Sequence, residues 1–414
     1  MIKILELFGG IGACSKALER LGIDYEIADY VEIDKYAVKS FNAIHNTNFE
    51  PQDICKWDKD IEVDLIMHGS PCQDFSLAGK QAGGDESSGT RSSLMYETIR
   101  IVDKLKPKYV IWENVKNLLS KKHIHNFNAY LERMDQLGYI NYYQVLNAKD
   151  YGIPQNRERV FTISIRKDIN KLFTFPQKQE LKLKLKDMLE DEVDEKYYLS
   201  DKMANFFIYN EQKQIEKGNG FRFNVNDGNV IAKTITTRAG GRMDDNFIGD
   251  KKLYIKNATK QGYLEACDGD GVNISSRMKY QRGNVQKESI QTLTTSGGND
   301  RGVIIGSTQK HAAISTNGIT PTLTSAMGQG GGHIPMHNYD LRIRKLTPRE
   351  VWRLMGFDDE DYEKAAQVNS NTQLYKQAGN SIVVNVLEAI LTKLLIDNSN
   401  QNVIKGQTTI FDYL

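Results

Sequence analysis

The first 165 residues alternate between short apolar runs and helical patterns, and this alternation constrains the fold more than any other feature of the chain. Ile2–Leu7 is an apolar run that ends in the glycine-rich turn Phe8–Gly12, and a helical pattern follows the turn. Tyr25–Val31 predicts a second strand, with a helix over Lys35–His45 behind it. Alternation of this kind predicts a mostly parallel sheet that helices cover on both faces.

Two further apolar runs, Val63–Met67 and Tyr109–Trp112, predict buried strands that are each followed by a polar loop. Ile140–Asn147 and Val160–Ile165 are also β-prone, and only about a dozen residues without a helical pattern separate them. We expect these two to form an antiparallel pair at the edge of the sheet. The predicted fold class is therefore α/β, with a mostly parallel sheet and an antiparallel edge.

The composition is that of a soluble globular protein and excludes several classes of function. Of 414 residues, 40% are hydrophobic and 26% are charged, and no run approaches the roughly 20 apolar residues that a membrane span needs. The first residues lead into a glycine turn rather than a cleavage site, so we expect a cytoplasmic protein. Four cysteines without CxxC pairing predict free thiols, and the histidines show no metal-ligand spacing, so we expect no metal.

The middle of the chain differs from its beginning. Residues 167–217 are rich in Lys, Glu and Gln, as in a charged helical connector. Residues 220–337 are dominated by Gly, Thr and Asn, and three copies of a threonine stretch lead into a glycine loop there, at 233–241, 291–298 and 321–332. A surface β-meander with glycine turns explains such copies, and so does a β-rich domain that presents loops on one face.

Charge is distributed unevenly although the whole chain carries a net charge of only +1. Residues 220–345 hold 17 Lys and Arg against 10 Asp and Glu, which is the local excess that contact with phosphate requires.

Helical patterns return after this segment. Thr347-Pro348-Arg349-Glu350 is a helix start with a cap, an early proline and a glutamate three residues after the cap, and Gly356 ends that helix. Asn380-Ser381 then opens an apolar helix over 382–396, which must pack on a large partner.

Three loops that follow predicted strands can hold a ligand. Gly10 and Gly12 let the backbone approach a ligand closely. Glu32 can accept hydrogen bonds from two ribose hydroxyls, and Asp53 with Ile54 can hold an adenine amino group. Ligands bind at the carboxyl ends of the strands in open parallel sheets, and all three loops fall there. A tight turn at the glycines and a solvated acid or helix cap at Glu32 remain alternatives.

Reactive side chains follow the next strands. The Cys72 thiol belongs to a Ser-Pro-Cys-Gln segment at the same sheet edge, whereas a free cysteine is most often a buried hydrophobe. Glu113 ends the following strand, where it is either a surface acid or a desolvated carboxyl whose pKa is raised. Arg157 and Arg159 share one face at the start of the last strand, where they can hold a phosphate or a base edge, or pair with nearby acids.

Five motifs, LFGGIG, SPCQ, ENV, QNRER and QAGNSIVVNV, closely resemble in this order the motifs of bacterial and phage DNA (cytosine-5) methyltransferases. The resemblance spans nearly the whole chain. It implies a Rossmann-like fold that binds S-adenosyl-L-methionine (AdoMet), with a catalytic domain at 1–180, a β-rich target-recognition domain at 181–340 and C-terminal helices at 341–414, the last packing back on the catalytic domain. Gly9 stands where the family usually has alanine, a change that should leave the turn intact.

The resemblance also implies a role for each site residue. Cys72 would add to C6 of a flipped cytosine, Glu113 would recognise the base, and Arg157 and Arg159 would support the base and the active-site loop. The implied AdoMet site comprises Phe8, Gly10, Gly12, Glu32, Ile33, Asp53, Ile54, Asn380 and Ser381. Residues 83–91 match the mobile loop that closes over DNA in this family.

The implied function is sequence-specific methylation of cytosine C5 in double-stranded DNA by a monomer, with a cognate restriction endonuclease as a candidate partner. Two alternatives remain. One branch of the family methylates tRNA, but it lacks a large recognition region, so the Gly/Thr-rich segment favours DNA. The other alternative is a catalytically silent DNA-binding regulator, against which the intact Cys72, Glu113 and arginine pair argue.

Overall fold

The computed structural model describes residues 1–71, 94–218, 222–223, 225–250, 342–397 and five short strands between residues 253 and 304. Cys72, residues 83–91 and the second and third threonine–glycine copies lie outside the described residues. The chain forms two compact units. Unit 1 comprises Met1–Asp191, Gly228–Asn246 and Leu346–Leu414, and unit 2 comprises Glu192–Asp227 and Phe247–Lys345.

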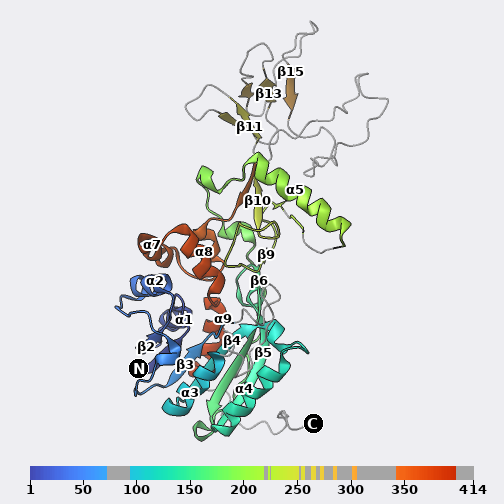
Figure 1. The fold of residues 1–414 in the computed structure, drawn as a ribbon. Helices are drawn as coiled ribbons and strands as arrows, with labels where there is room; N and C mark the ends of the chain where they lie inside the picture. Colours follow the sequence, from blue (N-terminus) through green and yellow to red (C-terminus); the bar gives the residue numbers. More distant parts are fainter. Residues whose placement is uncertain are drawn as a thin grey trace. The chain divides into compact units, whose positions relative to one another are not determined.

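Unit 1 is built on a sheet in which six described strands follow the order β2-β1-β3-β4-β7-β5. Figure 1 labels β2, β3, β4 and β5 of this sheet. β1 to β4 pair in parallel, whereas β7 is antiparallel to both β4 and β5. The predicted parallel sheet with an antiparallel edge is therefore confirmed. The strands are β1 Ile2–Leu7, β2 Tyr25–Val31, β3 Leu65–His68, β4 Tyr109–Val115, β5 Tyr139–Asn147 and β7 Glu158–Arg166.

Helices alternate with the parallel strands: α1 Ala13–Arg20, α2 Lys35–His45, α3 Met95–Leu105 and α4 Ile124–Gln136. Val110 and Trp112 of β4 pack in one core with residues of α3 and α4. Ile111, which points to the opposite face of the sheet, is equally buried. A strand that is buried on both faces must be apolar at successive positions, which explains the continuous apolar run in this strand.

Strand register places the loops of interest together. Leu7 at the end of β1 lies opposite Val31 of β2 and His68 of β3, and His68 lies opposite Trp112 of β4. Because these strands are parallel, the residues that follow the paired positions share the carboxyl edge of the sheet. These residues are Phe8, Glu32, Gly69 and Glu113.

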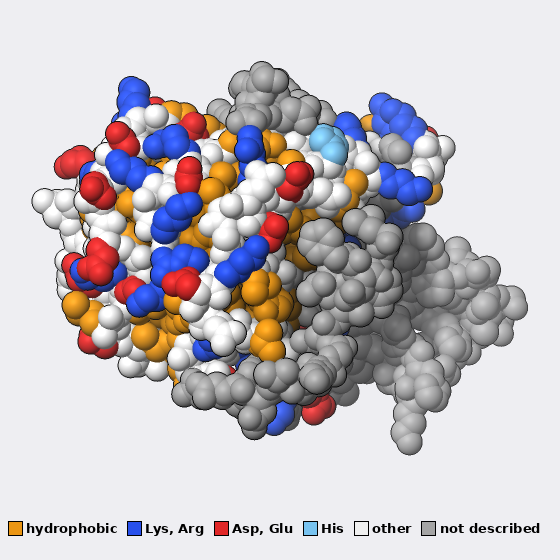
Figure 2. All heavy atoms as spheres, turned by 90° about the horizontal axis from the view of Figure 1, so that it is seen from below, with side chains coloured by type: hydrophobic (Ala, Val, Ile, Leu, Met, Phe, Trp, Pro, Cys, Tyr) orange, Lys and Arg blue, Asp and Glu red, His pale blue; other side chains and the backbone are white. Residues whose placement is uncertain are grey.

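The opposite, amino-terminal edge carries paired surface charges. Ion pairs there join Lys3 to Glu62 at 2.6 Å, Lys108 to Asp64 at 2.8 Å and Lys167 to Asp135 at 2.8 Å. Figure 2, which views the molecule from below Figure 1, shows basic and acidic side chains interspersed on the described part of this face. Charges of both signs that pair locally create no strong field, so this edge does not resemble a surface for a polyanion.

The C-terminal segment adds α6 Pro348–Arg353, α7 Asp359–Val368, α8 Asn371–Asn380 and α9 Val384–Leu391 to unit 1. α6 starts as predicted, because the Thr347 hydroxyl accepts the Glu350 N–H and the Glu350 carboxylate accepts the Thr347 N–H at 2.8 Å. The predicted helix start at Asn380-Ser381 is wrong, since Asn380 is the last residue of α8 and α9 begins three residues after Ser381. An Asn-Ser pair fits either end of a helix, and here Asn380 ends α8 and Ser381 is its C-cap.

Asn371–Ile396 is the one helical segment of the described chain that is long and apolar enough to cross a membrane by length and composition. It comprises α8, α9 and a π-helical turn, Thr392–Ile396, and α9 packs against α1. Leu387 and Ile390 of α9 are fully buried in this packing, and Glu388 pairs with Arg20 of α1 at 3.4 Å. We therefore interpret the segment as core helices of unit 1.

The charged connector is helical only in part. Within residues 167–217, α5 Asp201–Glu216 is the described α-helix, and three short 3-10 turns precede it. The prediction of a helical connector is therefore wrong for most of its first half. Leu and Lys alternate over 181–186, and a period of two places the leucines around a helix rather than on one face.

The described part of unit 2 consists of α5, a 3-10 turn and short strands. Phe207, Phe223 and Phe247 pack there with ring centroids 5.1–5.6 Å apart. The predicted β-rich character of this part is confirmed. Its strands are β8 Val225–Asn226, β10 Phe247–Asp250 and β16 Arg342–Lys345 in one sheet, β11 Leu253–Lys256 and β12 Tyr263–Ala266 in a second, and β13 Gly271–Ile274, β14 Gly283–Gln286 and β15 Arg301–Ile304 in a third.

Candidate active site

The turn after β1 has left-handed backbone at three positions, with φ of 54° at Phe8, 56° at Gly10 and 81° at Gly12. A Cβ atom at Gly12 would lie 2.2 Å from Nε2 of His45, so glycine alone fits there. A Cβ atom at Gly10 would have no neighbour within 4 Å, so the backbone of this residue borders open space. The turn therefore presents backbone groups at the sheet edge, as a ligand cradle requires.

Glu32 closes this turn from the end of β2. Its carboxylate accepts the backbone N–H of Gly10 at 3.2 Å and that of Asp34 at 2.8 Å. Burial raises the pKa of Glu32 even though these hydrogen bonds favour the charged form. The adjacent Ile33 side chain is 70% exposed, which puts an apolar surface beside the carboxylate. A sugar hydroxyl and a flat ring can bind to such a pair of neighbours.

Asp53 and Ile54 lie at the 3-10 turn Ile54–Lys56. The sequence suggested a strand-like segment directly before them, but the structure has a loop there. The backbone N–H of Gln52 donates to the Glu32 carbonyl at 2.8 Å. This hydrogen bond fastens the turn beside the end of β2, so the structure brings Asp53 near Glu32. The Ile54 side chain is buried.

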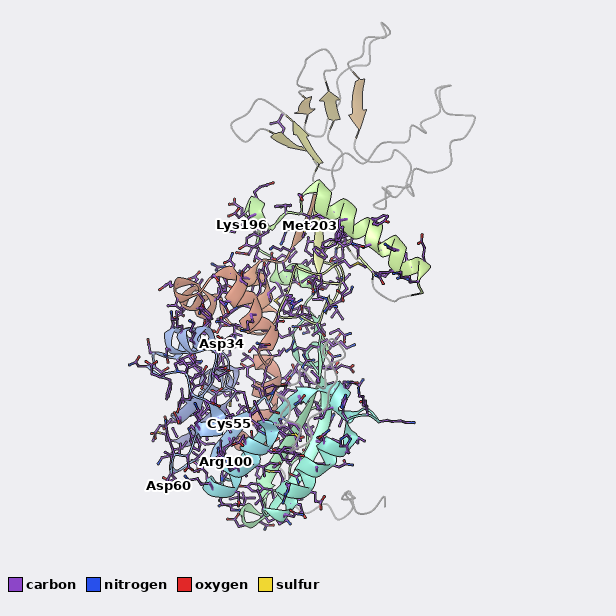
Figure 3. The ribbon with its side chains drawn as sticks, in the orientation of Figure 1. Asp34, Cys55, Asp60, Arg100, Lys196 and Met203 are labelled. Atoms are coloured by element: carbon purple, nitrogen blue, oxygen red, sulfur yellow. The ribbon has the colours of Figure 1, made fainter. Side chains whose placement is uncertain are left out.

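Arg100 of α3 supports this turn from the other side. Its guanidinium donates to the carbonyl oxygens of Ile54 at 3.0 Å and Trp57 at 2.9 Å. Figure 3 shows Arg100 and Cys55 on the same side of unit 1. The exposed Cys55 thiol therefore belongs to a fixed turn of the protein surface.

The Ser-Pro-Cys segment begins directly after β3. The Ser70 hydroxyl accepts a hydrogen bond from the indole N–H of Trp112 at 3.0 Å, and the Asn114 amide donates to the Ser70 carbonyl at 3.5 Å. Trp112 and Asn114 flank Glu113 on β4, so Ser70 holds the start of the segment in register with Glu113. Cys72, two residues further on, lies outside the described residues, and its place at this edge stays a prediction.

Glu113 is paired with Arg159, whose Nε lies 3.0 Å from Oε1 of the carboxylate. Burial raises the pKa of Glu113, and the positive charges of Arg159 and Arg157 oppose this shift without cancelling it. A carboxyl of this kind can keep its proton nearer to neutral pH and donate a hydrogen bond to a ring nitrogen. A Cβ atom at Gly69 would lie 3.7 Å from Oε2 of Glu113, so Gly69, the residue before Ser70, is a direct neighbour of Glu113.

Arg157 is almost fully buried, and its guanidinium donates to three backbone carbonyls. The acceptors are Ile235 at 3.0 Å, Gly379 at 3.2 Å and Ser381 at 2.8 Å. One side chain thus joins the sheet edge, the first threonine–glycine copy and the junction between α8 and α9. Arg157 directly precedes β7 and Arg159 lies within it, so the structure gives the two arginines different environments although they are only two residues apart.

Asn380 and Ser381 reach the site through this junction. The Cδ1 atom of Ile382 would lie 3.8 Å from a Cβ at Gly69, next to the Ser-Pro-Cys segment. On the other side of α8, the Lys376 ammonium lies 2.7 Å from the carboxylate of Asp34, which Figure 3 labels at the start of α2. Residues from early and late in the sequence therefore meet at the carboxyl edge of the sheet.

Sequence reasoning missed the role of Gln155 in this arrangement. Its side-chain carbonyl accepts the Ile235 N–H at 2.9 Å, and its amide donates to the Leu354 carbonyl at 2.8 Å. β6 Gln155–Asn156 also pairs in parallel with β9 Ala232–Lys233. The first threonine–glycine copy is thereby part of unit 1. The only signal was the position of Gln155 directly before Asn156 and Arg157 in the QNRER motif.

The part of the chain that the structure describes holds no cluster of His, Cys, Asp and Glu that fits a metal ion. The described groups at the edge are instead a glycine turn, two partly buried carboxyls whose pKa burial raises, and two arginines. Such a set can bind a nucleoside-like ligand and stabilise charge on a heterocyclic ring.

Known proteins share both the sequence and the fold. The family model for C-5 cytosine-specific DNA methylase matches residues 2–395. The chain is 35% identical to the orphan methyltransferase M.SPRI of Bacillus phage SPR, covering 95% of this chain and 97% of that protein. It is 31% identical to the type II methyltransferase M2.ScrFI of Lactococcus lactis subsp. cremoris, covering 95% of this chain and 99% of that protein.

The structural comparison identifies the same fold. A DNMT2 variant of Spodoptera frugiperda superposes with a TM-score of 0.61 at 20% identity, over 95% of this chain and 99% of that one. The Entamoeba histolytica methyltransferase EhMeth superposes with a TM-score of 0.59 at 14% identity, over 95% of this chain and 98% of that one. With the family match and the relatives' identity over nearly the whole chain, these findings show that the chain belongs to the C-5 cytosine-specific DNA methylase family and is a DNA (cytosine-5) methyltransferase.

Proposed function

We propose that this enzyme transfers a methyl group from AdoMet to C5 of a cytosine within a specific sequence of double-stranded DNA. The observation that carries the proposal is the partly buried Glu113–Arg159 pair beside Gly69 and Ser70, at the edge that also holds the glycine turn. A pyrimidine recognised by Glu113 would therefore lie between the segment of Cys72 and the predicted cofactor cradle.

The residues at the edge fit AdoMet. The open space at Gly10 suits the amino-acid part of the cofactor, Glu32 can accept both ribose hydroxyls, and the exposed Ile33 can pack on the adenine ring. Asp53 is near enough to Glu32 to take the adenine amino group. AdoMet supplies an electrophilic methyl group on its sulfonium when it is bound. Phe8, Gly12, Ile54, Asn380 and Ser381 complete the proposed site through backbone contacts and the junction after α8.

Cys72 is the proposed nucleophile. Its thiolate forms a bond to C6 of the extruded cytosine, and Glu113 gives its proton to N3 as the ring electrons move toward C5. C5 would then take the methyl group of bound AdoMet with that electron pair, and the broken methyl–sulfur bond would leave S-adenosylhomocysteine as the neutral thioether product. Loss of the C5 proton to a base or a water chain re-forms the C5–C6 double bond, expels the thiolate and lets N3 return its proton to Glu113. Free thiols have a pKa of about 8.5, so the site must favour the thiolate.

The two arginines have separate proposed roles. Arg159 orients the Glu113 carboxyl toward the base, whereas Arg157 fixes the backbone on which the base and the closing loop rest. The target carbon is stacked inside the duplex, so the base must be flipped out at a cost of a few kcal/mol. Residues 83–91 are the proposed loop that closes over the DNA and stabilises this state.

Labelling tests this function directly. The full-length enzyme is incubated with tritiated AdoMet and either genomic DNA or tRNA, and label is expected in DNA. Cys72→Ser should abolish the label while AdoMet binding stays nearly unchanged, and Cys55→Ser, which changes an exposed thiol, should keep it. Label in tRNA alone would exclude the DNA substrate, and absence of label in both would favour the silent regulator. Activity above a few per cent in Cys72→Ser would exclude the nucleophile.

Recognition is the second part of the proposal. We assign sequence recognition to residues within 220–337, because this segment combines the local basic excess with the threonine–glycine copies. Exchanging it for the matching segment of a relative should change the methylated sequence, which bisulfite sequencing of DNA from expressing cells would show. An unchanged sequence would place recognition elsewhere. We also propose that the enzyme is a cytoplasmic monomer. If it belongs to a restriction–modification pair, the methylated DNA sequence would identify the cognate endonuclease, which cuts the same sequence.

A further inference from the structure

Helix α1 begins without a side-chain cap of its own. Its N-cap residue is Gly12, so the first backbone N–H groups of the helix need acceptors from elsewhere. Glu6 of β1 provides them. Its carboxylate accepts the Ser15 N–H at 3.0 Å, the Ser15 hydroxyl and the backbone N–H of Cys14. A residue of the preceding strand thus caps the helix that follows the glycine turn.

This cap closes the glycine turn on itself. Glu6 lies two residues before Phe8, and Ser15 lies three residues after Gly12, so their contact joins the two ends of the turn. A Cβ atom at Gly9 would lie only 3.0 Å from Cβ of Glu6, which shows that the turn folds tightly over this side chain. The backbone angles of the turn therefore depend on the bond between Glu6 and Ser15.

We propose that Glu6 is a positioning residue of the cofactor site, whose carboxylate holds the glycine turn in the conformation that binds AdoMet. The proposal rests on the proposed function for its ligand and on the described contacts for its mechanism. A carboxylate can accept three hydrogen bonds at once and interacts favourably with the amino end of a helix. A protonated carboxyl keeps fewer acceptor sites and loses the charge, so the turn should loosen when Glu6 takes up a proton.

The surroundings of Glu6 make it sensitive to pH. It is 2% exposed, and no described cation pairs with it. Burial raises the pKa of Glu6 to about 7, although the hydrogen bonds from Ser15 and Cys14 oppose the shift. The other titratable groups near it are Cys14 of α1 and Tyr25 and Tyr30 of β2, and burial raises the pKa of each. Glu6 is therefore the group of this cluster that titrates near neutral pH.

Neighbouring cations and strands do not change this conclusion. Lys16 and Arg20 of α1 pair with the carboxylates of Asp361 and Asp358, and the β3 residue opposite Glu6 in the sheet is the apolar Met67.

A rise in pH affects the stability of the fold and the proposed AdoMet binding in opposite directions. A carboxyl whose pKa is raised by folding stabilises the protein at low pH and less so as the pH rises through about 7. The proposed binding, in contrast, strengthens as the pH rises.

The test measures the dissociation constant of AdoMet for the full-length enzyme by isothermal titration calorimetry between pH 5.5 and pH 8.5. At pH 8, Glu6→Gln should weaken binding about tenfold, as expected for lost hydrogen bonds to a charged acceptor. The ratio of the two dissociation constants should approach one below pH 6, where both side chains are neutral. This ratio cancels the titration of AdoMet itself. Glu26→Gln, on the exposed face of β2, is the matched control and should behave as the wild type.

A merely structural role of Glu6 would give a ratio that does not change with pH, and that result would overturn the proposal. Equal affinity of Glu6→Gln and wild type at pH 8 would do the same. Ser15→Ala covers the case in which Glu6→Gln does not fold, since it leaves the carboxylate in place and should weaken AdoMet binding several-fold. Wild-type affinity in Ser15→Ala would also contradict the proposal. Failure of the wild-type enzyme to bind AdoMet at any pH would instead refute the proposed function.

Discussion

Gly9 lies so close to Tyr30 that a Cβ atom at position 9 would come within 2.6 Å of Cε2 of the tyrosine ring. The ring cannot easily move away. It is fully buried, it stacks on Phe41 with centroids 3.8 Å apart, and its hydroxyl donates to the Gly10 carbonyl at 2.6 Å. The family resemblance places alanine at position 9. In this chain the glycine and the tyrosine therefore form a matched pair beneath the cofactor turn.

The alanine that is usual in the family should destabilise this enzyme. We expect Gly9→Ala to lower the free energy of unfolding by about 1–3 kcal/mol, which is typical of overpacking, and to weaken AdoMet binding. Urea denaturation of the full-length protein measures the first effect. In a Tyr30→Leu background the same substitution should cost only a few tenths of a kcal/mol. An equal cost in both backgrounds would show that the ring is not the cause.

Removing the acid function of Glu113 should affect the rate and not the cofactor. Glu113→Gln keeps the shape but cannot give a proton to N3, so we expect the single-turnover rate to fall about 10²–10³-fold with unchanged AdoMet affinity. Because burial raises the pKa of Glu113, its protonated fraction falls as the pH rises through that pKa. The alkaline decline of the wild-type rate should therefore disappear in the variant. Glu158→Gln, an exposed neighbour that pairs with Lys116, is the control, and an equal loss there would contradict the assignment.

The two arginines should separate stability from catalysis. Arg157→Ala removes the donor to three buried carbonyls, so we expect a loss of about 3 kcal/mol in the free energy of unfolding. Arg159→Ala removes a less buried side chain and its ion pair with Glu113. We expect it to lower the methylation rate with a much smaller loss of stability. Urea denaturation and single-turnover assays of both variants give the comparison. A larger loss of stability in Arg159→Ala would reverse our interpretation.

The local part of the fold was predictable from the sequence. β1, β2 and α2 have the predicted ends, because apolar runs bounded by glycine or by a capping Asp34 leave little choice of boundary. The carboxyl-edge loops also followed from the parallel alternation of strands. The segment before α5 did not, since its alternating leucines and lysines carry no helical period and its position depends on contacts with Gly228 and Val230 far along the chain.

The residues that hold the site in place were harder to predict than the residues that would contact the ligands. Glu32 and Glu113 stand at strand ends, where position alone suggests a function. Gln155 and Gly379, by contrast, act on residues about 80 to 200 positions away, and no local pattern encodes such a contact. Glu6 also looked like any residue of a strand, because its partners become adjacent only when the glycine turn folds.

Gly379 provides a test of the way the first threonine–glycine copy joins unit 1. It lies inside α8, where replacing glycine with alanine usually stabilises a helix by about 1 kcal/mol. Here a Cβ atom would lie 2.3 Å from the backbone N of Thr237 and 2.4 Å from the carbonyl carbon of Thr236. Backbone atoms cannot rotate out of the way as a side chain can, so one of the two segments would have to shift.

We therefore expect Gly379→Ala to lower the melting temperature by several degrees, since a loss of 1 kcal/mol corresponds to about 2 °C or more in a domain of this size. AdoMet binding should weaken as well, because Asn380 and Ser381 follow directly in the chain. Thr372→Ala, on the exposed first turn of the same helix, controls for helix propensity and should leave both quantities nearly unchanged. A rise in the melting temperature of Gly379→Ala would mean that helix propensity prevails and that residues 236 and 237 do not press against α8. Differential scanning fluorimetry with and without AdoMet distinguishes the two outcomes.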